Sequence, residues 1–229
     1  MSQTTELMYL RHGRATKNDD TGIVGGRSEF SPLVPKGVEE SIQAGYYLAK
    51  HAPTVGDVYA SPADHTVGTA RFALTMADRQ ILADRLSMAS HRPKDLIELY
   101  PGAIEGQVRP PGYKRLCDWE WDEVVSPGGE TLRMVMKRGK HRLTEIGKEH
   151  LGQVVLVCGH GALLKCVLAG LAAERGESPE VVKQLLATSI GYCTLSRLDY
   201  SPDDGLVPVY IGHPTSELNV PLPQSSAIH

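Results

Sequence analysis

The feature that most constrains the fold is the alternation of short apolar runs with longer segments of helical periodicity. The apolar runs are rich in β-branched or aromatic side chains, a pattern typical of strands. They lie at Leu7–Leu10, Val55–Ala60, Val154–Cys158, Tyr192–Leu198 and Leu206–Ile211. Helical spacing of apolar or small residues occurs between these runs, at Lys36–His51, Thr66–Ala77, Thr131–Leu151 and Leu163–Arg175. Strands that alternate with helices form βαβ units, so we predict an α/β fold with a largely parallel sheet.

The stretch from about Gly106 to Gly129 shows no clean period. It holds three prolines, four glycines and both tryptophans of the chain. A long irregular segment inside a compact domain is usually functional or disordered, and we interpret this one as the front of a lid. We therefore predict a single domain over residues 1–229, with a lid inserted at about residues 106–150 that continues into the Thr131–Leu151 helix. The polar, proline-rich tail at about residues 214–229 is expected to be ordered only in part.

Charge and composition exclude several classes of function. The chain has 24 Lys+Arg against 27 Asp+Glu, a formal charge of −3. Binding of nucleic acid needs a concentrated basic face, so this balance argues against it. The most apolar region, Val154 to Ala173, is interrupted by His160 and Lys165, so we expect no membrane span. The N-terminus has too short an apolar stretch for a secretory signal, and the four cysteines form no CxxC pair. We expect a reduced, cytoplasmic protein.

Two of the apolar runs are followed, after one intervening residue, by a histidine. Arg11 and His12 follow the first run, and in α/β sheets ligands bind beyond the carboxyl ends of the strands. His160, between Gly159 and Gly161, follows the third run and begins a helix, where free N–H groups and the helix dipole favour an anion. Each histidine could instead serve only a turn or a helix cap. That alternative weakens because a second strand end also offers histidine.

A third segment offers carboxylates. Glu98 and Glu105 lie on either side of Pro101-Gly102, and one of them could act as a general acid if it is partly desolvated. The alternative is a pair of solvated loop carboxylates. The chain has no GxxxxGK[ST], GxGxxG, GxSxG or HExxH motif, and no Asp or His cluster with metal-ligand spacing. Phosphoryl chemistry on histidine, without a metal or a cofactor, is what remains.

Six short motifs, taken in order between Leu7 and Leu198, resemble those of the histidine phosphatase superfamily, also called phosphoglycerate mutase-like. They are Arg11-His12-Gly13 with Asn18; Ser31-Pro32-Leu33 with Gly37; Ser61-Pro62 through Thr69-Ala70; Glu98, Gly102 and Glu105-Gly106; Pro127-Gly128-Gly129-Glu130-Thr131; and Val157-Cys158-Gly159-His160-Gly161. The resemblance implies an α/β three-layer sandwich, with a mostly parallel central sheet flanked by helices and an inserted lid. Each motif is weak by itself, and their shared order carries the resemblance.

The resemblance also implies roles for individual residues. His12 is the implied nucleophile, which attacks phosphorus as a neutral imidazole and gives a phosphohistidine. His160 holds phosphoryl oxygens, and Glu98 protonates the leaving alkoxide and then activates water. Glu105 is expected to orient its loop. The implied phosphate-binding residues are Arg11, Asn18, His65 and Gly161.

His65 departs from the family pattern, because the family has a second phosphate-binding arginine at this position. An arginine provides a permanent charge and a bidentate fork, whereas a histidine provides one donor and a charge that depends on pH. His65 could bind phosphate with activity favoured below neutral pH. Lys114, Arg115 or another lid residue could replace the arginine. Alternatively, phosphate binding is impaired and the chain is a weak or degenerate enzyme.

The motifs favour the phosphatase branch of this family. The mutase branch has E-R-H-Y-G where this chain has Glu98-Leu99-Tyr100-Pro101-Gly102, and it lacks the glutamate that Glu105-Gly106 supplies. We predict a metal-independent phosphomonoester hydrolase that acts on a small phosphorylated metabolite through a phosphohistidine. The alternatives are a phosphoglycerate mutase-type phosphotransferase and a degenerate phosphate-binding homologue. No nucleic-acid or membrane partner is expected, and a homodimer is one expectation because α/β enzymes of this size often pair.

Overall fold

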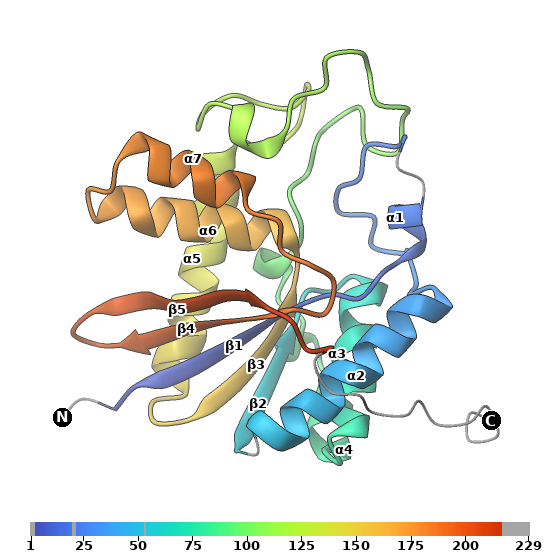
Figure 1. Cartoon of the computed structure of the whole chain (residues 1–229), viewed down its shortest axis with the longest axis vertical. Coiled ribbons are helices and arrows are strands. Elements are labelled where there is room, and N and C mark those ends of the chain that lie inside the picture. The colour runs from blue at the N-terminus through green and yellow to red at the C-terminus, as the bar shows by residue number, and fades with distance from the viewer. Residues whose placement is uncertain (1–2, 20–21, 53, 217–229) are drawn as a thin grey trace.

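A five-stranded mixed sheet organises the computed structural model, which describes residues 3–19, 22–52 and 54–216, without the side chains of residues 18 and 19. The strand order is β2-β3-β1-β4-β5 (Figure 1). The strands are β1 (Thr5–Arg11), β2 (Val55–Ala60), β3 (Val154–Gly159), β4 (Leu195–Ser201) and β5 (Gly205–His213). The expected tail at about residues 214–229 lies almost entirely outside the described residues.

The core of the sheet is parallel, as predicted. β3 pairs in parallel with β1 on one side and with β2 on the other. β4 and β5 instead pair antiparallel, β4 with β1 and β5 with β4. Only residues 202–204 connect β4 to β5, and so short a connection permits a hairpin, whereas a parallel pair needs a long crossover. β4 also begins at Leu195, later than the predicted Tyr192, because residues 188–194 form a loop.

Helices cover both faces of the sheet and complete the predicted three-layer sandwich (Figure 1). α2, α3 and α4 pack on one face, and α5, α6 and α7 pack on the other. The α-helices are α1 (Thr16–Asp19), α2 (Pro35–His51), α3 (Asp64–Met76), α4 (Gln80–Arg85), α5 (Leu132–Glu149), α6 (Gly161–Glu174) and α7 (Pro179–Ala187). The short 3-10 turns are η1 (Ala89–His91), η2 (Lys94–Leu96) and η3 (Leu116–Asp118). Within the described part of the chain, no helix combines the length and the apolar character needed to cross a membrane.

β1 shows why the strand signals are continuous apolar runs. Leu7 and Tyr9 face the core beneath α5 and α6, whereas Met8 and Leu10 face the core beneath α2 and α3. All four side chains are buried. A strand that is covered on both faces has no polar side, so its sequence does not alternate.

The segment predicted as a lid divides into an irregular half and a helix that belongs to the core. Residues 103–131 contain only η3 and isolated bridges, such as the one that joins Val108 to Ile23. α5, however, is not part of a lid. Its residues Leu132, Val135, Leu143 and Ile146 are at most 1% exposed, and they pack in the core between the sheet and α6. The lid therefore ends where α5 begins.

Candidate active site

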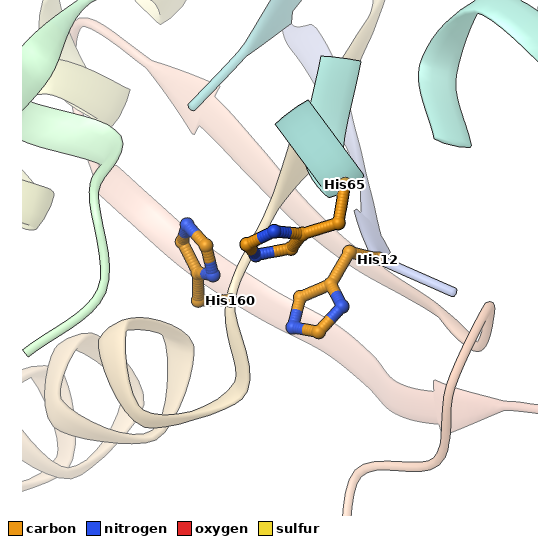
Figure 2. A group of neighbouring side chains, drawn as sticks. All are labelled: His12, His65 and His160. Carbon is orange, nitrogen blue, oxygen red and sulfur yellow. The ribbon is translucent and has the colours of Figure 1, made fainter. Parts of the chain in front are cut away.

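Three histidines meet at one edge of the sheet. His12 follows β1, His160 follows β3, and His65 lies in the first turn of α3, shortly after β2. Because these strands are parallel neighbours, their carboxyl ends lie together, where α/β folds bind ligands. The ring centroid of His12 lies 4.5 Å from that of His65 and 5.3 Å from that of His160. The ring centroids of His65 and His160 are 5.3 Å apart. Figure 2 shows a nitrogen of each ring turned toward the space between them.

The hydrogen bonding of His12 determines its tautomer. Its Nδ1 lies 2.8 Å from the carbonyl oxygen of Gly13, which can only accept, so Nδ1 carries the proton and Nε2 keeps its lone pair. Burial lowers the pKa of His12 well below its ordinary value, and the influence of His65, Arg11 and Lys17 lowers it further. The ring is therefore neutral at neutral pH, which is the state that a nitrogen nucleophile requires.

His160 is held through its backbone. Its N–H donates to the Tyr9 hydroxyl at 2.8 Å, and that hydroxyl lies 3.0 Å from the His160 carbonyl oxygen. A Cβ on Gly159 would collide with the same hydroxyl, so glycine is required there. The Nε2 of His160 lies 2.7 Å from Ser61 Oγ, where either atom can donate, and Nδ1 has no hydrogen-bond partner. Rotation of the Ser61 hydroxyl therefore permits either tautomer of His160.

His65 presents a lone pair rather than a charge. Its Nδ1 lies 2.9 Å from the carbonyl oxygen of Ser31 and must donate to it, while Nε2 is buried without a partner. Burial, and then the charge of Lys17, lowers the pKa of His65 to about 3. This geometry does not favour the hypothesis that His65 binds phosphate as a cation at pH values just below neutral.

Two cations accompany the histidines. Arg11 ends β1, donates through Nη1 to the Ile190 carbonyl, and has its Cζ 4.2 Å from the centre of the Tyr192 ring. The sequence motifs did not indicate Lys17, which lies in α1 shortly after His12 and next to Asn18. Its Nζ donates to the Gly26 carbonyl oxygen at 3.0 Å. Burial lowers the pKa of Lys17, and its charge in turn lowers the pKa of all three histidines.

Glu98 lies against the beginning of α6. Its Oε1 accepts hydrogen bonds from the N–H groups of Leu99 and Leu163, at 2.9 and 3.0 Å, and its Oε2 accepts from Ala162 at 3.1 Å. A carboxylate at this position complements the positive end of the helix dipole. Glu98 and His12 line the same cavity, so the structure brings the predicted acid and the predicted nucleophile together.

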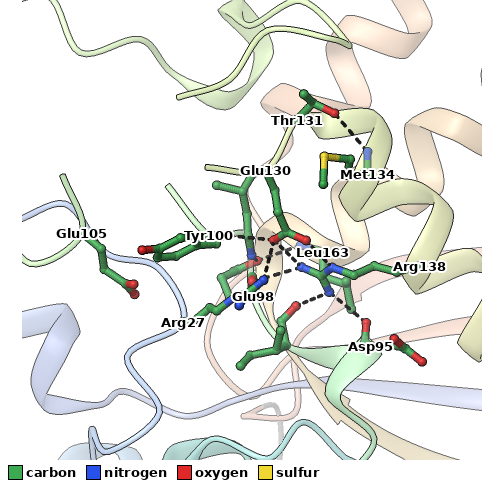
Figure 3. Close-up of polar contacts among 12 residues, drawn as sticks. Arg27, Asp95, Glu98, Tyr100, Glu105, Glu130, Thr131, Met134, Arg138 and Leu163 are labelled. Carbon is green, nitrogen blue, oxygen red and sulfur yellow. Dashed lines mark hydrogen bonds and ion pairs between the residues drawn. The ribbon is translucent and has the colours of Figure 1, made fainter. Parts of the chain in front are cut away.

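A buried ion pair, missed by the sequence analysis, fixes the segment that carries Glu98 (Figure 3). Arg138 of α5 donates to both carboxylate oxygens of Glu130, at 2.8 and 3.0 Å, and also to the carbonyl oxygens of Asp95, Ile97 and Glu98. Burial of Glu130 opposes its ionisation. The hydrogen bond and charge of Arg138, the Tyr100 N–H and the charge of Arg27 together outweigh burial and lower the pKa of Glu130. Glu130 belongs to the Pro127–Thr131 motif, and its structural role here is to hold Arg138.

The other predicted residues take different positions. Gly161 begins α6 beside Arg11, whose Nε would lie 3.2 Å from a Cβ at that position. Glu105 accepts a hydrogen bond from Ser28 N–H at 2.9 Å and thereby joins two loops. The side chain of Asn18 lies outside the described residues. Lys114 and Arg115 border the cavity, but both are exposed, and they pair with Glu123 and Asp118.

The cavity at this edge has a volume of about 410 Å³ and is shared between the strand ends and the lid. Arg11, His12, Lys17 and Glu98 line it outside the lid. The lid supplies Arg109, Tyr113, Lys114, Arg115, Leu116 and Trp119. The predicted lid therefore contributes cations and aromatic rings to the wall of the site.

Comparison with known proteins agrees with this arrangement of motifs. The model of the histidine phosphatase superfamily (branch 1) matches residues 7–210. This chain belongs to that superfamily. It is therefore an enzyme of the histidine phosphatase type, a phosphatase or a mutase.

Two curated relatives from Arabidopsis thaliana illustrate the similarity of this histidine phosphatase. A metal-independent phosphoserine phosphatase is 27% identical over 173 residues, which cover 72% of this chain and 68% of the relative. Phosphoglycerate mutase-like protein 4 is 25% identical over 193 residues, which cover 81% of this chain and 77% of the relative.

Solved structures share the fold. Phosphoglycerate mutase from Bacillus anthracis superposes with a TM-score of 0.72 at 22% identity, covering 93% of this chain and 94% of the other. Phosphoserine phosphatase from Entamoeba histolytica, crystallised with 3-phosphoglyceric acid, gives a TM-score of 0.68 at 18% identity, covering 91% and 96%. At these identities the likeness concerns the fold alone.

Proposed function

We propose that this histidine phosphatase hydrolyses phosphomonoesters of small metabolites, without a metal, through a phosphohistidine on His12. The observation that carries the proposal is the neutral His12 ring. Its Nδ1–H donates to the Gly13 carbonyl oxygen, and its Nε2 keeps a free lone pair where His12 lines the cavity. An imidazole held in this way is a nucleophile without any need for a separate base.

In the first step, the Nε2 lone pair of His12 forms a bond to phosphorus while the bond from phosphorus to the ester oxygen breaks. The leaving oxygen takes a proton from the Glu98 carboxyl group. In the second step, water gives a proton back to Glu98 and attacks phosphorus, which releases inorganic phosphate and restores Nε2. Glu98 thus gives up a proton in the first step and regains one in the second, so the two steps together leave it unchanged.

Lys17 takes the part that the family's second arginine would have. It lines the cavity together with Arg11 and His12, and its charge acts on all three histidines. Lys114 and Arg115, by contrast, are exposed and neutralised by acidic neighbours. A lysine can stabilise the charge of the phosphoryl oxygens, although it lacks the bidentate geometry of arginine. His160 assists by donating from Nδ1 when the Ser61 hydroxyl donates to Nε2.

The substrate is expected to be small and to carry a second anionic or polar group. The cavity is about 410 Å³ in volume, and its lid wall carries Arg109, Lys114 and Arg115. Of the relatives, the phosphoserine phosphatase matches with the higher identity, and its substrate class fits such a site. Transfer between two hydroxyls of a phosphoglycerate is the second candidate, favoured by the mutase-like relative.

The test is hydrolysis of p-nitrophenyl phosphate from pH 5 to 8 in excess chelator, with His12→Ala as the comparison. We expect release of p-nitrophenol that depends on His12 and survives chelation. Full activity in His12→Ala would refute the nucleophile. Conversion of 3-phosphoglycerate to 2-phosphoglycerate, faster than release of inorganic phosphate, would favour the mutase instead.

A further inference from the structure

The replacement of the family's arginine by His65 has brought three imidazoles together in a buried cluster. His12, His65 and His160 are at most 2% exposed, and one ring nitrogen of each lies within 4.8 Å of the others. An arginine at position 65 would repel a metal ion, whereas a neutral histidine offers it a lone pair. The same substitution that removes a phosphate ligand therefore supplies a third metal ligand.

The hydrogen bonds leave one inward nitrogen available on each ring. His12 and His65 donate from Nδ1 to backbone carbonyl oxygens, which leaves Nε2 of each with a lone pair. On His160 the free nitrogen is Nδ1, provided that Nε2 donates to Ser61 Oγ. Histidines that bind zinc almost always donate their other N–H to a carbonyl, carboxylate or water. His12 and His65 have a carbonyl oxygen as this outer partner, and His160 has the Ser61 hydroxyl in its place.

The three ring nitrogens would have to move only a short distance toward one another to bind one metal ion. Zn–N bonds are about 2.0–2.1 Å long. The centre of an equilateral triangle with sides of 4.8 Å lies about 2.8 Å from each corner, so each ring must move inward by at most about 0.7 Å. Two of the groups that share this end of the cavity, Lys17 and Arg11, oppose a cation, and the Glu98 carboxylate offsets part of their charge. His12 borders the cavity, so water or an anion can reach a fourth coordination position.

We propose that His12, His65 and His160 form a binding site for a divalent transition metal of the zinc class, and that the bound ion inhibits this phosphatase. Metal binding does not depend on the proposed function, but inhibition does. The Nε2 lone pair of His12 either attacks phosphorus or binds the metal, because it cannot do both. Metal and phosphate substrate therefore compete for the same site.

Binding is measured with Co²⁺, which reports tetrahedral coordination through its visible absorption, on the full chain after chelator treatment. We expect one tightly bound Co²⁺ per chain, displaced by Zn²⁺. His65→Arg should weaken binding by at least about 100-fold, because loss of an outer partner alone costs about 10–100-fold. The control, His141→Gln, removes an exposed histidine of α5 and should bind as the wild type does. Equal binding by His65→Arg would overturn the proposal.

A second measurement needs no variant. Imidazole ¹⁵N spectra of the wild type with and without Zn²⁺ identify the ligating atoms. We expect shifts of Nε2 in His12, Nε2 in His65 and Nδ1 in His160. Shifts confined to His91 and His150, which lie near Asp57, would refute the site.

The inhibitory part is tested by turnover of p-nitrophenyl phosphate. We expect Zn²⁺ to inhibit competitively and His65→Arg to be resistant; activation by Zn²⁺ would refute inhibition. If the chain bound Co²⁺ as predicted but turned over no phosphate ester, the proposed function would fail while the metal site stood.

Discussion

Replacement of Lys17 by methionine tests whether this lysine stands in for the missing arginine. Its Nζ reaches the Gly26 carbonyl oxygen, and its side chain borders the cavity that also holds His12. Two unit charges about 4 Å apart interact by about 4 kcal/mol at an effective dielectric constant of about 20. Removal of one donor to a developing negative charge has a measured cost of about 2.7–4 kcal/mol, or about 10²–10³-fold in kcat. We expect a loss of that size in Lys17→Met.

The matched control is Lys114→Met. Lys114 borders the same cavity, but its side chain is 43% exposed and pairs with Glu123 at 2.6 Å. An exposed pair of this kind contributes about 0–1 kcal/mol, so the control should lose less than about fivefold. Steady-state hydrolysis of p-nitrophenyl phosphate measures both variants. Equal losses in the two variants would refute the role given to Lys17.

The pH profile gives a readout that a purely structural loss would not. The charge of Lys17 helps to lower the pKa of His12. Without that charge His12 accepts a proton more easily, so its pKa rises. The acidic limb of kcat/KM, where His12 becomes protonated, should therefore move to higher pH in Lys17→Met. The same limb should not move in Lys114→Met.

Three further predictions concern the histidine, the acid and the buried ion pair. His65→Arg alone should change kcat/KM by less than about threefold. Added to Lys17→Met, the same substitution should raise kcat/KM by at least about tenfold, since one cation suffices. Kinetics of the double variant check this, and no rescue would contradict it. Glu98→Gln should slow alkyl phosphates more than p-nitrophenyl phosphate, because poor leaving groups need the proton; equal losses across a leaving-group series would argue against Glu98 as the acid. Glu130→Gln should destabilise the fold by up to about 3–5 kcal/mol, because it leaves the Arg138 charge buried without its partner. Since folding lowers the pKa of Glu130, this stabilisation is complete above the unfolded pKa of about 4.3 and disappears as pH falls through the folded pKa. Urea unfolding of the wild type and the variant at pH 7 and at decreasing pH measures it. A difference in unfolding free energy that stays constant at all pH values would refute the link to ionisation.

The lid prediction illustrates where sequence reasoning fails. The periodicity of Thr131–Leu151 correctly predicts a helix, and α5 runs from Leu132 to Glu149. Periodicity shows that one face is apolar but not what that face will contact. The partners of α5 are α6 and the sheet, from distant parts of the chain. Assigning the helix to a lid was therefore wrong, although the helix itself was predicted.

The sequence by itself determined the fold class and pointed to all three histidines, to His12 and His160 by their place after apolar runs and to His65 by the family resemblance. Continuous apolar runs such as Leu7–Leu10 arise because strands buried on both faces have no polar side, and they predict the parallel core. His12 and His160 were recognised because each follows such a run by two residues, after Arg11 and Gly159. These signals are local: they depend on neighbours along the chain.

Only the tertiary structure decided which groups act together. Lys17 carries no motif of its own, and its position near the three histidines depends on where the fold places α1. Glu130 and Arg138 are likewise ordinary charges until burial makes them a pair. The state of His65, neutral and with a free nitrogen, follows from its burial and from its contact with Ser31. Charge, tautomer and pairing are set by desolvation and by contacts between residues far apart in sequence, and a linear pattern contains neither.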